Sequence, residues 1–329
     1  MLIKTIRTGG LILASLLFLT GCNPEVSFDG YSLVDDEGVQ YGQLEWTIAA
    51  NAEGTTIPVR VTIEPDIGEV EFLGSARVYP QETTTYTLKA EAERTDGGFW
   101  TTITNVTIHI GPRVDYDLIE DSNLRACLEE TNFTHIEQFK TLLCFDRGIE
   151  SLEGIQQFTQ FSSASLDQNT ISDYSPLSAL QELHSLSLTS ANIVDLTGFP
   201  YIPSLTTLVL YDNQISDIRP LESNSQLLNL TLNSNKITDT QQFESLQELD
   251  SLLLKNNLID DASGLAFNTG LIALDLSNNL IENGVIELQT LTNAIGIDLR
   301  GNKPTHCFEY AQLFLKLGPV MLFDQCTFP

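Results

Sequence analysis

Hydrophobic residues recur at a fixed spacing through the second half of the chain, in the pattern Leu-x-x-Leu-x-Leu-x-x-Asn-x-Ile. The clearest copies span 205–215, 227–237, 249–259 and 271–281. Copies of the pattern begin at Phe139, Phe161, Leu183, Leu205, Leu227, Leu249, Leu271 and, more weakly, Ala294. The first seven starts are 22 residues apart and the last interval is 23. A short unit repeated at this period predicts a solenoid whose exposed face usually binds a partner.

Each copy predicts one short strand followed by a compact return. Alternate residues of the Leu-x-Leu stretch point to opposite faces, so the leucines face inward and successive strands form a parallel sheet. A second apolar set then fills the back of the core, as in Ile171, Tyr174, Leu177 and Leu180. Only about ten residues remain for the return, into which a full crossover helix barely fits, so we expect short 3₁₀ turns or extended chain.

An asparagine follows the strand in most copies. Its side-chain amide can bond to backbone groups that the turn leaves unpaired, once in every coil. We therefore predict a structural ladder formed by Asn169, Asn213, Asn235, Asn257, Asn279 and Asn302. Two copies depart from the pattern, with Arg147 and Ala191 at this position.

The repeat resembles the 22-residue leucine-rich repeat of internalin-like bacterial proteins, over residues 119–329. Such proteins carry a helical cap before the first repeat, and residues 120–128 look like that cap, with Asp121 or Ser122 as the N-cap. The resemblance implies an α/β-type leucine-rich-repeat solenoid with a cap over 113–138, eight repeats over 139–303 and a C-terminal cap over 304–329. A scaffold of this kind does not identify a partner.

Residues 1–22 have the features of a secretory signal. Lys4 and Arg7 form its basic end, and an apolar stretch follows over 11–19. The stretch ends Leu-Thr-Gly-Cys22, which resembles a bacterial lipobox and implies cleavage before Cys22 and a lipid on that cysteine. The alternative is an ordinary signal peptide with an incidental cysteine. Asn23, in place of the aspartate that favours inner-membrane retention, implies a lipid-anchored protein of the outer membrane, facing the periplasm or the cell surface.

Five cysteines occur, and four remain once Cys22 is assigned to the lipid. They lie in two pairs near the ends of the repeat region, and secretion places them in an oxidising compartment. We therefore expect disulfides Cys127–Cys144 and Cys307–Cys326; the alternative is four free buried thiols. Metal binding is disfavoured because no Cys-x-x-Cys occurs and the pairs are far apart.

Residues 28–112, after a short tether over 23–27, lack the leucine repeat and are rich in Thr, Val, Ile and Tyr. Short alternating runs over 59–63, 86–90 and 102–110 predict strands of an all-β sandwich. The runs over 44–46, 61–68 and 83–88 resemble bacterial immunoglobulin-like domains, which commonly serve as spacers or adhesive modules. Trp46 is interpreted as the core tryptophan of this sandwich rather than as part of a ligand site.

The formal net charge of −28 excludes the basic footprint of a nucleic-acid-binding protein. It also disfavours unassisted docking to anionic membranes, so the lipid is the expected anchor. The acidity can serve solubility; cation binding by acidic loops is the alternative, although no calcium-loop motif occurs. We expect no metal and no cofactor.

No catalytic motif is present, and the four histidines are scattered along the chain. His184 lies beside Ser185 and Ser187, but no orienting acid accompanies a Ser/His pair there. We interpret His184 as an exposed residue and expect no enzymatic activity.

Outward positions of the predicted strands supply the candidate binding residues. Exposed aromatic and apolar groups there would anchor a partner, and strands ~4.8 Å apart make a face roughly 35 Å long. The candidates are Phe145, Asp167, Val209, Tyr211, Asn233, Leu253, Lys255, Asp275 and Arg300. Tyr211 and Lys255 are the strongest; Val209 and Leu253 could instead be strand formers, and Phe145 could pack under the cap.

The leading hypothesis is a lipid-anchored, non-enzymatic envelope protein that binds a protein or a glycan through this face. The alternative is a structural or assembly protein of the periplasm or outer membrane. An enzyme is a distant third. The sequence names no partner and no oligomeric state.

Overall fold

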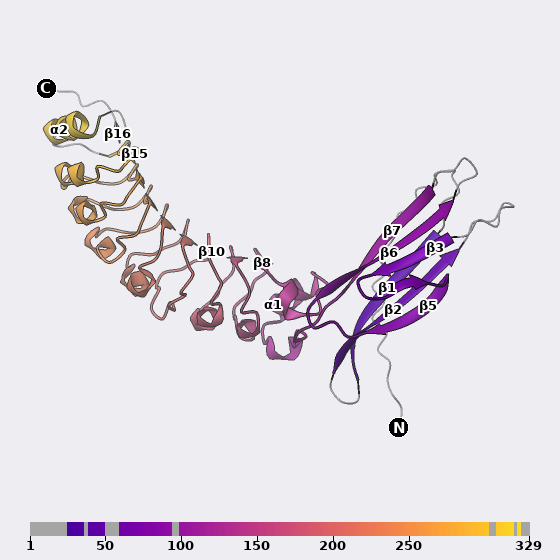
Figure 1. Ribbon diagram of the computed structural model, residues 1–329. Helices are drawn as coiled ribbons and strands as arrows, with labels where there is room; N and C mark the ends of the chain where they lie inside the picture. Colours follow the sequence, from indigo (N-terminus) through magenta and orange to yellow (C-terminus); the bar gives the residue numbers. More distant parts are fainter. Residues whose placement is uncertain are drawn as a thin grey trace. The chain divides into compact units, whose positions relative to one another are not determined.

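The computed structural model describes residues 25–35, 39–49, 59–93, 99–302, 307–318 and 321–323. The chain divides into two compact units, 1–110 and 111–329, and each is described separately (Figure 1). Among the described residues, no helix has the length and apolar character needed to cross a membrane. Cys22 and Cys326, and with them the lipidation site and one partner of the predicted C-terminal disulfide, lie outside the described residues.

The first unit consists of two antiparallel sheets, ordered β1-β2-β5 and β4-β3-β6-β7. Its strands are β1 (Glu25–Val34), β2 (Gln40–Ala49), β3 (Val59–Glu64), β4 (Gly68–Val70), β5 (Leu73–Val78), β6 (Thr84–Glu93) and β7 (Phe99–Ile108). Inward residues of both sheets share one apolar cluster, which includes Leu44, Ile63, Leu88 and Ile108, all fully buried. The cluster explains the alternating pattern of the sequence, because every second residue of each strand faces it.

Two sequence expectations for this unit can be compared directly with the structure. Trp46 is 5% exposed in the shared core and donates from Nε1 to the carbonyl of Glu71 at 2.9 Å, as a core residue would. The tether expected over 23–27 is too long, because β1 begins at Glu25 and pairs with β2 from its first residue. Pairing to a neighbouring strand, which no local pattern reveals, extends β1 to this point.

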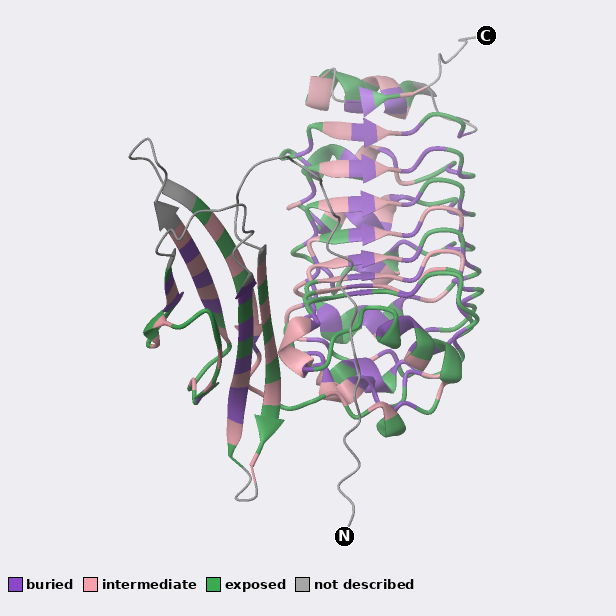
Figure 2. Ribbon diagram, turned by 90° about the vertical axis from the view of Figure 1, so that its right-hand side faces the viewer, coloured by how far each residue is buried: buried purple, intermediate pink, exposed green. Residues whose placement is uncertain are grey.

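The second unit is a solenoid built on one parallel sheet in the order β16-β15-β14-β13-β12-β11-β10-β9-β8. Eight of these strands fall on the predicted repeats: β8 (Thr141–Leu143), β9 (Ser163–Ser165), β10 (Ser185–Ser187), β11 (Thr207–Val209), β12 (Asn229–Thr231), β13 (Ser251–Leu253), β14 (Ala273–Asp275) and β15 (Gly296–Asp298). A further strand, β16 (Met321–Leu322), pairs with β15. In Figure 2 the middle residue of each strand is buried between less buried neighbours, as alternation requires.

Most of the coils, each coil being one repeat, return through 3₁₀ turns, as their length predicts. These turns are η3 (Ile155–Gln157), η4 (Ser175–Ala179), η5 (Arg219–Asn224), η6 (Gln241–Phe243), η7 (Ser263–Phe267) and η8 (Ile286–Thr290), and the N-terminal cap adds η1 (Tyr116–Leu118) and η2 (Ile136–Gln138). Apolar residues of strands and returns form a single continuous core along the solenoid. Each coil therefore buries its apolar face against its neighbours rather than within itself.

The predicted asparagine ladder is present. Asn235 is typical: its Nδ2 donates to the carbonyl of Leu210 in the preceding coil at 2.8 Å and to that of Leu232 at 3.1 Å. Its Oδ1 accepts the backbone N–H of Ile215 at 2.9 Å. Asn169, Asn213, Asn257, Asn279 and Asn302 repeat this arrangement. In each of these six coils, one buried side chain thus pairs backbone groups of two successive coils.

A left-handed residue precedes the ladder position in every coil. Its φ lies between 51° and 57° in seven coils, and Gly301 occupies the same place in the last with φ of 75°. The other seven are Asp146, Gln168, Ser190, Asp212, Ser234, Asn256 and Asn278. Short polar side chains tolerate this conformation better than branched ones, which explains the small polar residues at this position.

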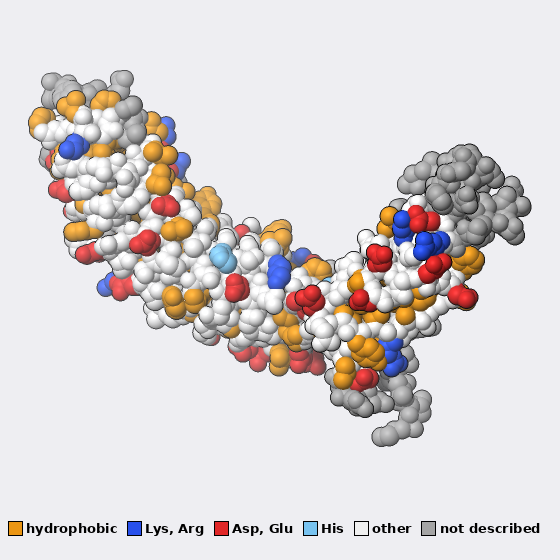
Figure 3. Space-filling model, in the orientation of Figure 1, with side chains coloured by type: hydrophobic (Ala, Val, Ile, Leu, Met, Phe, Trp, Pro, Cys, Tyr) orange, Lys and Arg blue, Asp and Glu red, His pale blue; other side chains and the backbone are white. Residues whose placement is uncertain are grey.

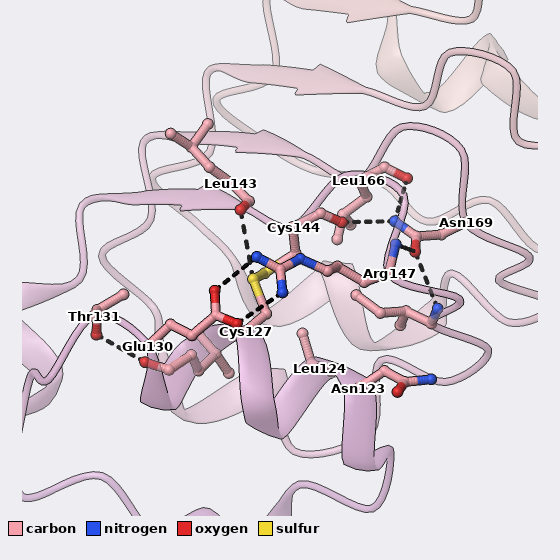
Figure 4. Close-up of a disulfide and its surroundings, with 12 residues drawn as sticks. Asn123, Leu124, Cys127, Glu130, Thr131, Leu143, Cys144, Arg147, Leu166 and Asn169 are labelled. Atoms are coloured by element: carbon pink, nitrogen blue, oxygen red, sulfur yellow. Dashed lines mark hydrogen bonds and ion pairs between the residues drawn. A yellow bond between two sulfur atoms is a disulfide. The ribbon is translucent and has the colours of Figure 1, made fainter.

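The N-terminal end of the solenoid is closed by α1 (Ser122–Glu129) and a disulfide. Cys127 of α1 is bonded to Cys144, which follows β8, with Cα atoms 5.9 Å apart (Figure 4). Arg147, which takes the place of a ladder asparagine, instead makes two bonds to Glu130 at 2.6 and 2.7 Å. Its backbone N–H still donates to Asn169. The departure from the repeat therefore ties the first coil to the cap. At the other end lies α2 (Cys307–Leu317).

Asp121 joins the cap to the first return. One carboxylate oxygen accepts the N–H groups of Asn123 and Leu124 at the start of α1, as an N-cap does. The other accepts those of Glu150 and Ser151 at 2.8 and 3.1 Å. Partial burial raises the pKa of this carboxyl, but the four backbone hydrogen bonds outweigh it and hold the pKa below its usual value.

The ladder is testable with Asn235→Ala. This change leaves the buried N–H of Ile215 without a partner and removes one of the two amide donors of the carbonyls of Leu210 and Leu232. We therefore expect a loss of about 1–3 kcal/mol in the free energy of unfolding. Urea unfolding followed by circular dichroism measures it. The matched control is Asn229→Ala, at an exposed position on β12; its effect should stay within about 0.5 kcal/mol. Equal losses in the two variants would contradict the assigned role.

Asp121→Ala should destabilise the folded chain by about 0.5–2 kcal/mol at pH 7, because it removes a helix cap. The pKa of Asp121 is lowered by folding, so its contribution is present above the unfolded-state pKa and disappears as the pH falls through the folded-state pKa. The gap in stability between wild type and variant should therefore close below about pH 4. A stability gap between wild type and Asp121→Ala that stays constant with pH would contradict the role assigned to this carboxylate.

Candidate functional site

The candidate site is the outward side of the parallel sheet, on the inner curve of the solenoid. We call it the concave face, formed by the outward residues of β8–β15 and the residue two positions after each strand. In Figure 3 hydrophobic side chains lie along the border of the solenoid that carries the strands in Figure 1. The face is exposed in every coil, so its side chains decide what it can bind.

Large apolar side chains stand at two places on this face. In the first coil Leu143 and Phe145 are 62% and 59% exposed, and Figure 4 shows Leu143 directed away from the disulfide. Phe145 therefore does not pack under the cap. In the middle coils Tyr211 is 43% exposed, beside the half-buried Val209. Leu253, two strands from Val209 in the same row, completes the second group.

Between these groups lies a row of small polar residues that bond to one another. Asp167 accepts the hydroxyls of Ser165 and Ser187 at 2.9 and 2.5 Å, and the N–H of Thr189 at 2.7 Å. These bonds tie the side chains of neighbouring strands to one another. We name this segment the polar trough, defined by Ser165, Asp167, Ser187 and Thr189.

The charged groups of the face differ in whether they have a partner within the protein. Arg300 forks onto Asp298, with Nη2 at 2.6 Å from Oδ2. Burial raises the pKa of Asp298, but its bonds to Arg300 and the charges of Arg300 and Lys255 bring that pKa below the usual value. Among the described residues, the Lys255 ammonium makes no hydrogen bond or ion pair, although its charge acts on Asp298; its hydrogen-bond donors are therefore available to a partner.

Some of the site residues predicted from the sequence present apolar, aromatic or ammonium groups at the face, and others bond to neighbouring groups of the sheet. Val209, Tyr211, Leu253 and Lys255 lie together at the centre of the face, and Phe145 stands apart in the first coil. The remaining candidates also support the face itself: Asn233 accepts the N–H of Lys255, and Asp275 accepts that of Ser277, while Asp167 and Arg300 have the partners given above.

The described residues give no sign of a reacting centre. His184 is exposed, and its Nδ1 lies 2.5 Å from the carbonyl of Glu182 rather than beside a serine hydroxyl. Within the described ranges, no group of three or more His, Cys, Asp or Glu side chains is placed to hold a metal ion.

Two sets of structural residues escape the leucine pattern. Asn224 and Asn268 are fully buried where other coils place Leu or Ile, and both bond backbone carbonyls of the preceding coil. A row of aspartates begins the returns of five consecutive coils, each accepting the N–H two residues later: Asp173, Asp195, Asp217, Asp239 and Asp261. Reading the 22-residue register at every position, rather than at the apolar ones, would have shown both.

Three solved structures of bacterial proteins are similar to this chain. The internalin InlC2 of Listeria monocytogenes is 26% identical, with a TM-score of 0.54, over 65% of this chain and 99% of that one. InlF of the same species is 29% identical (TM-score 0.49, 57% of this chain and 54% of that one), and a leucine-rich-repeat protein of Leptospira interrogans is 18% identical (TM-score 0.44, 58% and 55%). This chain thus spans about half the length of the last two proteins. No protein-family model matches the chain, and no curated protein does.

The repeated coils on one parallel sheet define the class: the second unit is a leucine-rich-repeat solenoid, and it is similar to the internalin InlC2.

Proposed function

We propose that this chain is a lipid-anchored protein of the bacterial cell envelope that binds a protein or glycan partner through the concave face, without enzymatic activity. The observation that carries the proposal is the group formed by Val209, Tyr211, Leu253 and Lys255. These side chains are uncommitted, whereas their polar neighbours are used within the sheet. Exposed aromatic and apolar groups on a rigid surface are typical anchors of binding.

The rigidity of the face supports the proposal. Its strands are fixed to one another by the sheet and by the buried asparagines behind it, so little conformational freedom is lost when a partner docks. The likeness to the internalin InlC2 supports a binding role as well, because internalin-like repeat folds commonly bind proteins. The face also offers an extended surface rather than an enclosed cavity, which suits a macromolecular partner.

The first unit fits the role of a spacer in this proposal. The hydroxyl of Ser32 donates to the carbonyl of His109, so the end of β7 lies beside the far end of β1. Glu25, where the chain enters, is seven residues away along an extended strand, or about 23 Å. Entry and exit thus lie at opposite ends of the unit. A two-sheet domain with this geometry, of the immunoglobulin-like kind, would separate a lipid on Cys22 from the start of the solenoid.

The face is testable by affinity capture from envelope extracts with the full mature chain. Tyr211→Ala combined with Lys255→Ala should reduce recovery of a specific partner by at least about tenfold, since such central residues dominate interface energies. Leu258→Ala combined with Lys236→Ala is the matched control: both residues are exposed on the turns that follow the strands. Equal recovery with wild type and the Tyr211/Lys255 variant would reject this face.

The location is testable by protease treatment of intact cells. A surface-facing receptor should lose its solenoid while a periplasmic marker protein survives. Full protection of the solenoid in intact cells, with digestion after the outer membrane is opened, would favour the structural or assembly role in the periplasm. A Cys22→Ala chain that still partitions with membranes would contradict anchoring by lipid.

A further inference from the structure

We propose that the partner at the concave face is a polypeptide segment, held by two separate apolar anchors on either side of the polar trough. This inference rests on the proposed function and narrows it, because it chooses protein over glycan. The first anchor is Leu143 with Phe145. The second is Val209, Tyr211 and Leu253, with Lys255 beside them.

The hydrogen bonds of the trough argue against a sugar. Hydroxyl groups of a glycan need donors and acceptors that are free to receive them, because an unpaired buried polar group costs about 1–3 kcal/mol. In the trough the hydroxyls of Ser165 and Ser187 already donate to Asp167, which also accepts the N–H of Thr189. At the centre of the face, Asn233 accepts the N–H of Lys255. The side chains left uncommitted are mainly apolar, and they fit amino-acid side chains.

The spacing of the anchors sets the length of the segment. Leu143 and Val209 occupy the same row of the sheet, three strands apart. At about 4.8 Å per strand the two lie about 14 Å apart. An extended polypeptide advances about 3.3 Å per residue and points alternate side chains to one face, so residues i and i+4 reach both anchors. The polar trough lies between the two anchors, beneath the residues that join them.

Charge indicates one further feature of the segment. Asp298 is paired with Arg300, and Asp167 has three donors. The charge of Lys255 acts on Asp298, but the Lys255 ammonium makes no hydrogen bond or ion pair among the described residues. A carboxylate next to the second apolar residue of the segment would therefore pair with Lys255. The expected motif is an apolar residue, three intervening residues, a second apolar residue and an adjacent Asp or Glu.

The test is selection of 12-residue peptides from a random display library on the mature full-length chain, with a glycan array probed in parallel. Selected peptides are then titrated against wild type and three double-serine variants. Leu143→Ser with Phe145→Ser removes the first anchor, and Tyr211→Ser with Leu253→Ser removes the second. Leu258→Ser with Leu280→Ser, at leucines 46% and 43% exposed away from the face, is the control. Thermal unfolding establishes that each variant is folded; Phe145→Ala and Tyr211→Ala replace any that is not.

The proposal expects peptides with the i, i+4 apolar motif whose affinity falls at least about tenfold with each anchor variant and stays unchanged with the control. Peptides that depend on Tyr211 and Leu253 alone would overturn the two-anchor inference but leave the concave face as the binding site. Glycans whose binding depends on these residues would overturn the choice of a polypeptide and also leave the proposed function standing. Failure to select any peptide overturns this inference. Equal binding of the selected peptides to wild type and to every variant overturns both this inference and the proposed concave binding site.

Discussion

The solenoid depends on a backbone constraint. Each coil leaves its strand through a left-handed turn, and this turn leaves backbone N–H and C=O groups without strand partners inside an apolar core. The asparagine at the next position supplies the missing hydrogen-bond partners. In Asn235 a single amide pairs two carbonyls and one N–H, and the bonds reach into the neighbouring coil. Because leucine could fill the space but not pair these groups, the ladder fixes the distance and register of successive coils as well as their packing.

The asparagine ladder also fixes the backbone positions of the concave face. Outward side chains such as Tyr211 and Lys255 stand on strands whose opposite side is locked by buried leucines and asparagines. The face therefore needs no rearrangement to present its anchors. Where the ladder is interrupted, at Arg147, a bidentate bond to Glu130 and the Cys127–Cys144 disulfide close the end of the stack instead.

Periodicity made the repeated parts of the fold predictable. The strands, the 3₁₀ returns, the inward leucines and the asparagine positions all follow from a 22-residue register, because every coil meets the same surroundings. Features that depend on one particular neighbour were not predictable. The two-residue β16 exists only through pairing with β15, and Glu130 meets Arg147 only once the cap is folded. At the site, sequence placed Asp167 correctly on the face but could not show that its carboxylate serves the trough.

Amide hydrogen exchange of the mature chain tests the central interaction most directly. The N–H groups of Ile215, Ile237 and Ile259 each donate to the amide oxygen of a ladder asparagine rather than to a strand. If the ladder holds the coils together in solution, these three amides exchange as slowly as those of the central strands β11–β13. Rapid exchange at the three positions, with the strands still protected, would show that the ladder is not formed and would remove the basis for a rigid concave face.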